Sequence, residues 1–432
     1  SVPVMAMQHE FGGYWRTRAW TEQNLDGDDS DYNDNDYTAV DTRTRLYYTA
    51  VFHENLKFVN KFEFDADWGS PANGDIGIDT VGVEVKNSYI DFNLGPLNAK
   101  IGGQYFALGR GFLFADDAYG AILTFKGNNF AIPLMWIKAY EGNSGGLGDN
   151  SGDFDFYGIA PSFSSGNFSV NPYILYATSD RAADWSPTVH SPLASSCYSD
   201  EDCDNRLVGA DDLDIFYAGI DVDLSFDPVS VWFTGIYQTG EIDLLHFDES
   251  GDVESWLAAL GAKFAMGFGD IHFESFYAEG DDEKTGDEFE AFFVPSQNDW
   301  SGQSYYWAEI MGYGIFDDRV SRNSPADKIS DIFAVNIGTT VKPMPKLSIS
   351  LDAWYARKAD DVEFSYSTEE GTEWNEESDL GVEVDLKITY ELIPGLKLDV
   401  VGAYLFAGDA TTGGVEDAAD PYEIGSRLSL SF

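Results

Sequence analysis

The sequence predicts an all-β fold: a transmembrane antiparallel up-and-down β-barrel of about 18 strands, formed as a single domain by residues 1–432. Three observations predict it. Apolar and polar residues alternate over segments of about 10 to 14 residues, whereas soluble strands average about 5 to 6. Tyr, Trp or Phe often ends the apolar face, as in the aromatic girdles of membrane barrels. Very short connections alternate with long ones along the chain.

The alternation is strict in residues 57–68, 347–355 and 381–392. In residues 381–392 one face carries Val382, Val384, Leu386, Ile388 and Tyr390, and the other carries Glu383, Asp385, Lys387 and Thr389. Successive side chains of a strand point to opposite faces. Each such segment therefore predicts a strand with one apolar and one hydrated face.

The connections between strands fall into two classes. Eight short ones carry Gly, Pro, Asn or Asp, the residues of tight turns: 54–57, 94–97, 126–129, 164–167, 226–229, 267–270, 343–346 and 393–396. Nine longer, mostly acidic ones lie between them: 21–41, 69–82, 109–119, 142–152, 180–212, 243–252, 281–330, 361–378 and 409–420. Eight turns and nine loops join eighteen strands, with both chain ends on the short-turn side. Short periplasmic turns and long extracellular loops are typical of bacterial outer-membrane barrels.

The last strand is expected at residues 423–432, where Leu428, Leu430 and Phe432 alternate with Ser429 and Ser431. We expect it to pair with the first strand, near residues 7–20, because an open sheet edge is not tolerated in lipid. A C-terminal Phe on such a strand resembles the terminal signature of outer-membrane proteins, which the insertion machinery reads.

Composition narrows the class of partner and the compartment. Lys+Arg 25 against Asp+Glu 75 gives a net charge of −50, which excludes nucleic acid as a partner. Hydrophobic content of 44% favours a folded chain. No stretch approaches the roughly 18 apolar residues of a membrane helix. We expect Ser1 to follow a removed signal peptide, and the outer membrane of a Gram-negative bacterium to be the location, with its lipid and lipopolysaccharide as partners.

Four arginines are predicted to form a basic patch inside the barrel. Arg16 and Arg18 lie two apart on the first strand, and Arg43 and Arg45 lie two apart on the second. They should face the lumen, since a mid-membrane charge toward lipid costs roughly 2–4 kcal/mol. A symmetric hairpin would place Arg16 opposite Arg45 and Arg18 opposite Arg43. Further basic residues extend this side: Lys61, Lys86, Lys100 and, across the closure, Arg427.

Another wall is predicted to be mainly acidic. The same parity argument turns five carboxylates inward: Asp221, Asp223, Asp352, Glu383 and Asp385. Opposed basic and acidic walls create a transverse field that orients charged solutes. The alternative is that these charges pair with each other or only hydrate the lumen. In residues 103–121, Arg110, Asp116 and Asp117 are candidates for lining a constriction.

One segment resembles a known family. NSYIDFNLGPLNAKIGGQYFALGRGFLF, residues 87–114, is similar to a strand–turn–strand segment of the alginate-export family of outer-membrane channels. In both, an aromatic-containing strand, a Gly/Pro turn and a Gly-Gln-containing strand follow one another. The resemblance implies a barrel channel. In that family an arginine-rich lumen carries a polyanion, whereas the lumen predicted here is of mixed charge, so we take only the architecture from it.

Two loops carry features of their own. Residues 304–316 of loop 281–330 are rich in aromatic side chains, which need burial, so the loop should fold into the barrel mouth or lumen or onto a neighbouring subunit. Loop 180–212 is expected to behave likewise. It contains Cys197 and Cys203, for which we predict a local disulfide and hence an oxidising compartment. Two free thiols are the alternative.

The loop LDGDDSDYNDND, residues 25–36, suggests calcium, since closely spaced carboxylates are hard oxygen ligands. The candidate ligands are Asp26, Asp28, Asp29, Asp31, Asp34 and Asp36. The loop is not an EF-hand, because no Glu closes it, and a solvated acidic loop is the alternative. No other cofactor is expected.

The expected function is an outer-membrane porin for passive diffusion of small hydrophilic solutes or ions. The first alternative is a selective export or uptake channel for an anionic saccharide or another specific substrate. A surface adhesin or structural barrel is the next. An outer-membrane hydrolase is the least favoured, because none of the five histidines has a recognisable Ser/His/Asp setting. We therefore predict no enzyme. The solute, and the choice between a monomer and a homotrimer, stay open.

Overall fold

A closed β-barrel accounts for most of the chain. The computed structural model describes residues 7–29, 36–77, 81–141, 153–180, 187–188, 210–244, 250–281, 288–297, 302–368, 371–413 and 418–432. In chain order the barrel strands are β1 (Gln8–Gln23), β2 (Tyr37–His53), β3 (Leu56–Asp67), β4 (Glu84–Leu94), β5 (Leu97–Leu108), β6 (Phe114–Lys126), β7 (Phe130–Tyr140), β8 (Phe154–Ile159) with β9 (Ser162–Ser165), β10 (Phe168–Asp180), β12 (Ala210–Phe226), β13 (Val229–Leu244), β14 (Ser250–Met266), β15 (Gly269–Ala278), β18 (Ile332–Met344), β19 (Leu347–Thr368), β20 (Gly371–Ile393), β21 (Leu396–Ala407) and β22 (Tyr422–Ser431).

Smaller elements lie in the connections: a 3-10 turn η1 (Gly109–Gly111), β11 (Pro187–Thr188), β16 (Glu288–Phe289), β17 (Ser296–Gln297) and a helix α1 (Asp409–Thr412). Strands β8 and β9 both pair with β7 and with β10, so together they form one of the 18 strands of the barrel. In the described part of the chain, no helix is long and apolar enough to cross a membrane.

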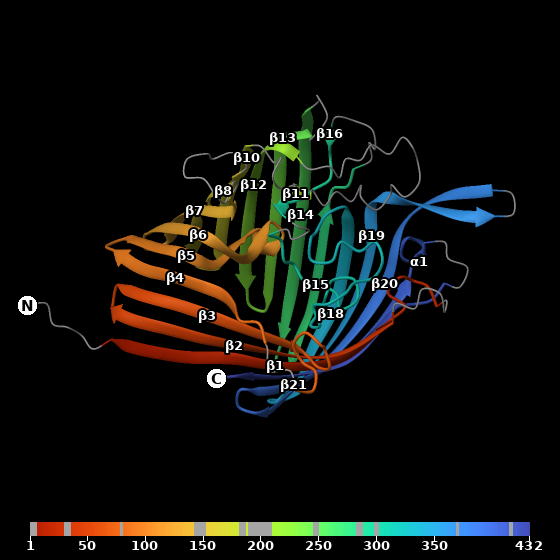
Figure 1. Cartoon of the computed structure of the whole chain (residues 1–432), viewed down its shortest axis with the longest axis horizontal. Coiled ribbons are helices and arrows are strands. Elements are labelled where there is room, and N and C mark those ends of the chain that lie inside the picture. Colours follow the sequence, from red (N-terminus) through yellow and green to blue (C-terminus); the bar gives the residue numbers. More distant parts are fainter. Residues whose placement is uncertain are drawn as a thin grey trace, which may run out of the picture.

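Each barrel strand pairs antiparallel with the next, and β1 pairs with β22 to close the ring (Figure 1). The pairing extends to the last residue: the Gly13 N–H donates to the Phe432 carbonyl at 2.8 Å, and the Phe432 N–H donates to the Gly13 carbonyl at 3.1 Å. The predicted all-β barrel of 18 strands is thus confirmed.

All eight short turns fall where the sequence predicts them, as in the pairs Leu94↔Leu97, Phe226↔Val229 and Met266↔Gly269. Two predicted loops are mostly strand. Residues 114–119 of the predicted loop 109–119 belong to β6, which pairs with β5 from Leu108↔Phe114 onward. Most of 361–378 is a strand ladder that runs from Val362↔Glu377 to Thr368↔Gly371. Alternation of Val, Phe and Tyr with polar residues continues through 362–366, which favours strand over loop. Strands β19 and β20 therefore project beyond their neighbours (Figure 1).

The outer face of the barrel is apolar. Its side chains are exposed although they are large and hydrophobic, as with Phe11 (80% exposed), Tyr119 (61%) and Ile424 (56%). A monomeric soluble protein rarely exposes so much apolar surface. The side chains that alternate with them along each strand form the inner face.

The inner face is covered unevenly. On the side of β10 and β12 to β15 it carries fully buried apolar side chains such as Leu175, Ile215 and Phe276. Two connections pack against them. One is η1 with Phe112 and Leu113, and the other is the irregular segment 302–331, which we call the inner segment (Figure 1). The opposite side, β1 to β5, carries the charged side chains described next.

Candidate functional site

The register of β1 and β2 differs from the predicted one by two residues. Arg16 lies opposite Arg43, Arg18 opposite Asp41, and Tyr14 opposite Arg45. The predicted pairs Arg16–Arg45 and Arg18–Arg43 are therefore wrong, because the connecting loop is not centred where a symmetric hairpin would place it. The actual register puts a carboxylate beside Arg18, which removes one of the two Arg–Arg contacts.

Carboxylates on the neighbouring strands neutralise most of the basic patch. Arg18 forms an ion pair with Asp41, and its Nε lies 3.0 Å from Oδ1 of that residue. Arg43 pairs with Asp65 at 2.6 Å, and Arg45 pairs with Glu63. Across the closure, Arg427 pairs with Asp399 at 2.9 Å.

Arg16 differs from these four. Its side chain is buried, with the residue 8% exposed, yet its Nε and Nη2 atoms have no hydrogen-bond partner among the described residues. Its cross-strand neighbours are Arg43 and Ser429. A buried guanidinium without an anionic partner costs several kcal/mol in a typical protein, so this position favours an anion.

The inner segment contacts this patch from within the barrel. The Arg18 guanidinium donates a hydrogen bond to the Phe316 carbonyl, and the Phe316 ring stacks on Trp20 with centroids 5.6 Å apart. Arg18 also lies 4.9 Å from the Trp20 ring centroid. The middle of the inner segment therefore lies against the edge of the arginine patch and narrows the space in front of it.

The predicted acidic residues of β20 lie beneath the inner segment. The two carboxylate oxygens of Glu383 accept the backbone N–H groups of Ile310 (2.6 Å) and Met311 (2.9 Å). Asp385 accepts the N–H of Glu309 at 3.4 Å. Glu383 is fully buried and Asp385 is 5% exposed. In this geometry both acids bind backbone donors rather than facing an open pore.

The turn after β5 packs against the inner segment within the barrel. Arg110, with a positive φ of 57°, reaches across to Asp223 at 2.6 Å and lies 5.0 Å from the Trp232 ring centroid. Phe112 stacks on Tyr305 of the inner segment with centroids 3.7 Å apart. The Gln303 side chain donates to the Phe112 carbonyl at 2.7 Å. Turn and segment therefore form one packed unit.

The remaining candidate side chains lie near these groups. Asp221 accepts the Thr234 hydroxyl at 2.7 Å. Asp117 accepts the Asn87 amide at 2.8 Å and lies 3.7 Å from the Lys86 ammonium. Asp116 accepts the Asp117 backbone N–H at 2.6 Å. Lys61 lies opposite Tyr47 and Asn87 on the neighbouring strands.

The sequence did not single out the basic residues at the outer mouth. A cavity of about 540 Å³ there is lined by Leu25, Asp26, Arg319, Val320 and Arg322. Arg319 lies 4.0 Å from the Tyr37 ring centroid, and Arg322 donates to the Thr412 carbonyl at 3.3 Å. Both arginines lie in a connection without strand periodicity. Only their positive charge, in a chain that is otherwise acidic, could have identified them from the sequence.

Burial changes the acidity of the inner segment. Desolvation raises the pKa of Asp327 to about 6. It also raises the pKa of Glu309 and of Asp318 above their ordinary values. All three carboxyls therefore resist ionisation while the segment is packed inside the barrel.

The calcium and disulfide predictions stay predictions. Cys197 and Cys203 lie outside the described residues, as do Asp31 and Asp34. Asp26 accepts the Asp28 backbone N–H at 3.2 Å, and Asp36 accepts that of Asn24 at 3.2 Å. Within the described ranges, no three His, Cys, Asp or Glu side chains are arranged to hold a metal ion.

Comparison with known proteins places the fold. No family model and no curated protein matches the chain. Among solved structures, OccAB4 of Acinetobacter baumannii matches with a TM-score of 0.57 at 9% identity, over 100% of this chain and 99% of that one. OpdK of Pseudomonas aeruginosa, solved with vanillate, matches with a TM-score of 0.55 at 11% identity, over 98% of each chain. OpdQ of the same species matches with a TM-score of 0.55 at 12% identity, over 98% of each chain. The chain has the fold of outer-membrane porins.

Proposed function

We propose that the protein is a passive-diffusion channel of a Gram-negative outer membrane and that it prefers small anionic hydrophilic solutes. The barrel fold, its apolar outer face and the likeness to porin structures support the channel and its location. The observation that carries the anion preference is Arg16, a buried guanidinium with two unpartnered nitrogen atoms beside Arg43.

The energetic argument concerns the barrier at the narrowing. The Nε and Nη2 atoms of Arg16 are buried, so the guanidinium must turn toward the lumen to donate to a passing anion, which then supplies the acceptors that these donors otherwise lack. Such charge-assisted bonds contribute about 1.5–3 kcal/mol each. A cation gains nothing there, and it is repelled by the charge of Arg16, because carboxylates already neutralise the neighbouring arginines Arg18 and Arg43. Transient pairing at this point lowers the barrier for anions alone.

The net charge of −50 opposes this preference, since it attracts cations to the protein. Distance decides between the two effects. At about 0.15 M salt the Debye length is about 8 Å, so acidic loops more distant than that are screened at the narrowing. Arg16 acts at contact distance and is screened much less. We therefore expect the anion preference to increase as salt is raised from low values.

The narrowing by turn η1 and the inner segment also favours the selective alternative, a channel for one class of anionic solute such as an acidic saccharide. OpdK was solved with vanillate, a small aromatic carboxylate, and its barrel is similar in fold. The resemblance to the alginate-export family, lipopolysaccharide contact and a homotrimer stay predictions.

The hydrolase alternative gains no support. His272 is the described histidine closest to a catalytic setting, between Asp270 at 2.9 Å and Asp352 at 2.6 Å. Both of its ring nitrogens are taken by carboxylates. No ring nitrogen is left to serve as a base toward a nucleophile, which triad catalysis needs.

The test is the reversal potential in planar bilayers under a KCl gradient. Wild type should conduct in discrete steps with anion preference, and Arg16→Ser should lose most of that preference. The double variant Arg45→Gln with Glu63→Gln is the matched control, because it removes an ion pair without changing the lumen charge. Equal ion preference in wild type and Arg16→Ser would refute the assignment of Arg16. Absence of conducting steps would refute the channel itself.

A further inference from the structure

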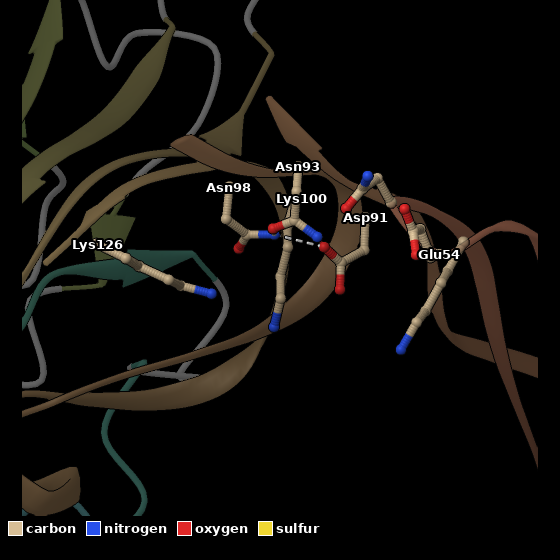
Figure 2. A pocket seen from close by; sticks show the side chains of 8 residues that line it. Glu54, Asp91, Asn93, Asn98, Lys100 and Lys126 are labelled. Carbon is tan, nitrogen blue, oxygen red and sulfur yellow. Dashed lines mark hydrogen bonds between the residues drawn. The ribbon is translucent and has the colours of Figure 1, made fainter. Parts of the chain in front are cut away.

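A second polar cavity lies at the other end of the basic side of the barrel, near the short turns. It measures about 260 Å³ and is lined by Glu54, Asn55, Lys57, Asp91, Asn93, Asn98, Lys100 and Lys126 (Figure 2). These residues come from β3 to β6 and from the turn between β2 and β3. The short turns of bacterial barrels face the periplasm, so the cavity lies at the periplasmic mouth.

Strand register brings the charges of this cavity into one row. Lys57 lies opposite Asp91, and Asp91 lies opposite Lys100, on three consecutive strands. Their neighbours in sequence, such as Ile90 and Ile101, are exposed on the outer face. The row therefore faces the interior. On β6, Ile122 and Thr124 lie opposite Lys100 and Asn98, so they share the inner face. Lys126, two residues farther along β6, lies on the same face.

The three ammonium groups are free to bind an anion. No ion pair joins Lys57, Lys100 or Lys126 to a carboxylate among the described residues. Asp91, which lies between two of them, instead accepts the Asn98 side-chain amide at 2.6 Å. The same amide lies 3.1 Å from the Asn93 side-chain oxygen. Lys100 keeps its ammonium 5.9 Å from the Tyr89 ring centroid. Figure 2 shows Asp91 and Lys100 projecting toward the same space.

The balance of charges selects the kind of anion. Three lysines against Glu54 and Asp91 leave one net positive charge. A polyanion would be repelled by the two carboxylates, whereas a single carboxylate would neutralise the excess. Asp91 and the asparagine side-chain oxygens accept hydrogen bonds, so the same ligand should carry hydroxyl donors. A cavity of 260 Å³ is smaller than the roughly 300–1,000 Å³ of sites for drug-sized ligands.

We propose that this cavity is a second solute site, which binds a monoanionic hydroxylated carboxylate of the size of one sugar acid. The lysines bind the carboxylate, and the side chains of Asp91, Asn93 and Asn55 bind the hydroxyls. The proposal rests on the proposed function for its role in transport but not for binding itself. On β2, Arg43 lies opposite Arg16, and Val51 lies opposite Lys57 of the cavity. A solute released from Arg16 would therefore reach the cavity eight residues farther along β2. At about 3.3 Å per residue that is about 26 Å.

The test measures binding of sodium glucuronate to the full chain in detergent by isothermal titration, with glucose and acetate as comparison ligands. Glucuronate should bind more tightly than either, because only it combines a carboxylate with hydroxyls. The double variant Lys100→Gln with Lys126→Gln should bind about tenfold more weakly or worse, through the loss of charge-assisted hydrogen bonds. The double variant Lys342→Gln with Lys346→Gln is the control, since both lysines are exposed at the same end of the barrel but outside the cavity.

Three outcomes would overturn the proposal: equal affinity in wild type and in the cavity variant, equal affinity for acetate, or equal affinity for glucose. The binding measurement needs no conduction, so it tests the cavity even if no channel activity is found. Arg16→Ser should still bind glucuronate at the cavity. Loss of ion preference in that variant with retained binding would separate the two sites.

Discussion

The fully buried carboxylate of Glu383 accepts the backbone N–H of Ile310 at 2.6 Å. It is the clearest anchor between the barrel wall and the inner segment, because the other oxygen of the same group accepts the Met311 N–H at 2.9 Å. Because Glu383 binds two backbone N–H groups, it fixes the position of the inner segment whatever side chains the segment carries there. The space left inside the barrel therefore depends on β20 as much as on the segment.

Glu383→Gln should loosen this anchor, because an amide can accept only with its oxygen and turns its NH₂ toward a second donor. We expect docking of the segment to weaken by about 1–3 kcal/mol, as for a buried donor left unpaired. Single-channel recording should then show larger or more frequently fluctuating steps. Glu391→Gln, on the same strand near its end, is the control and should leave the steps unchanged. Identical recordings for both variants would contradict the role of Glu383.

Asp41→Asn should strengthen the anion preference. The substitution removes the carboxylate that neutralises Arg18, while the hydrogen bond from Arg18 to the Phe316 carbonyl keeps the guanidinium in place. The reversal potential under a KCl gradient should shift further toward the value for chloride. Asp67→Asn, one strand away opposite Asp41, is a comparable change without an ion pair to Arg18 and should shift it less. A shift toward cations in Asp41→Asn would contradict this account.

Phe112→Ala should open the narrowing. The Phe112 side chain is fully buried and stacks on Tyr305 with centroids 3.7 Å apart, so its removal leaves a cavity between the turn and the inner segment. Truncation of a buried Phe to Ala typically costs about 3–5 kcal/mol of stability. Liposome swelling should show faster entry of larger neutral sugars. Phe11→Ala, on the outer face, should not change the rate. Unchanged exclusion of large sugars in Phe112→Ala would show that the limit lies elsewhere.

Acid should tighten the inner segment. Burial raises the pKa of Asp327 from its ordinary 3.8 to about 6, and it raises the pKa of Glu309 and Asp318 as well. Between pH 3.8 and about pH 6 the docked segment binds more protons than the released one. Docking therefore becomes more favourable as the pH falls through this range, and it weakens as the pH rises through about 6. Conductance should therefore decrease between pH 7 and pH 5. Asp327→Asn should flatten that change, and an equally steep one would exclude Asp327 as its source.

Closure of the ring can be tested at Gly13. A Cβ at this position would lie 2.5 Å from the Phe432 ring and 2.8 Å from the Arg45 carbonyl oxygen. Gly13→Val should therefore reduce the fraction of chain that folds, seen as loss of the heat-modifiable band on a gel. Gly402→Ala is the control, because the space around Gly402 is open. A normal folded band in Gly13→Val would show that the first and last strands tolerate rearrangement.

The sequence predicted the parts of this molecule that repeat. Alternation and turn chemistry are local, so the strands, the eight turns and the closure by residues 423–432 follow from short stretches of sequence. Strand ends are less well determined, as the ladder from Val362 to Thr368 shows. There alternation continues through residues that are acidic enough to be interpreted as a loop.

The candidate site was only partly predictable. The four arginines are visible as residues spaced two apart, but their register depends on the length of an irregular loop, and a two-residue offset separates Arg18–Asp41 from Arg18–Arg43. That Glu383 and Asp385 lie beneath the inner segment depends on where residues 302–331 pack, and no periodicity encodes that. The cavity of Lys57, Lys100 and Lys126 combines turns that are distant in sequence.

The ladder between β1 and β22 joins residues about four hundred positions apart, from Tyr14↔Ser431 to Gln23↔Tyr422. Such a contact cannot form until synthesis has reached the final strand. Until then the nascent sheet has two unpaired margins, whose amide and carbonyl groups hydrocarbon cannot satisfy. Delivery to the bilayer must therefore wait for the whole polypeptide, or a helper must shield both margins, and chains cut short before β22 should be degraded rather than accumulate as smaller barrels.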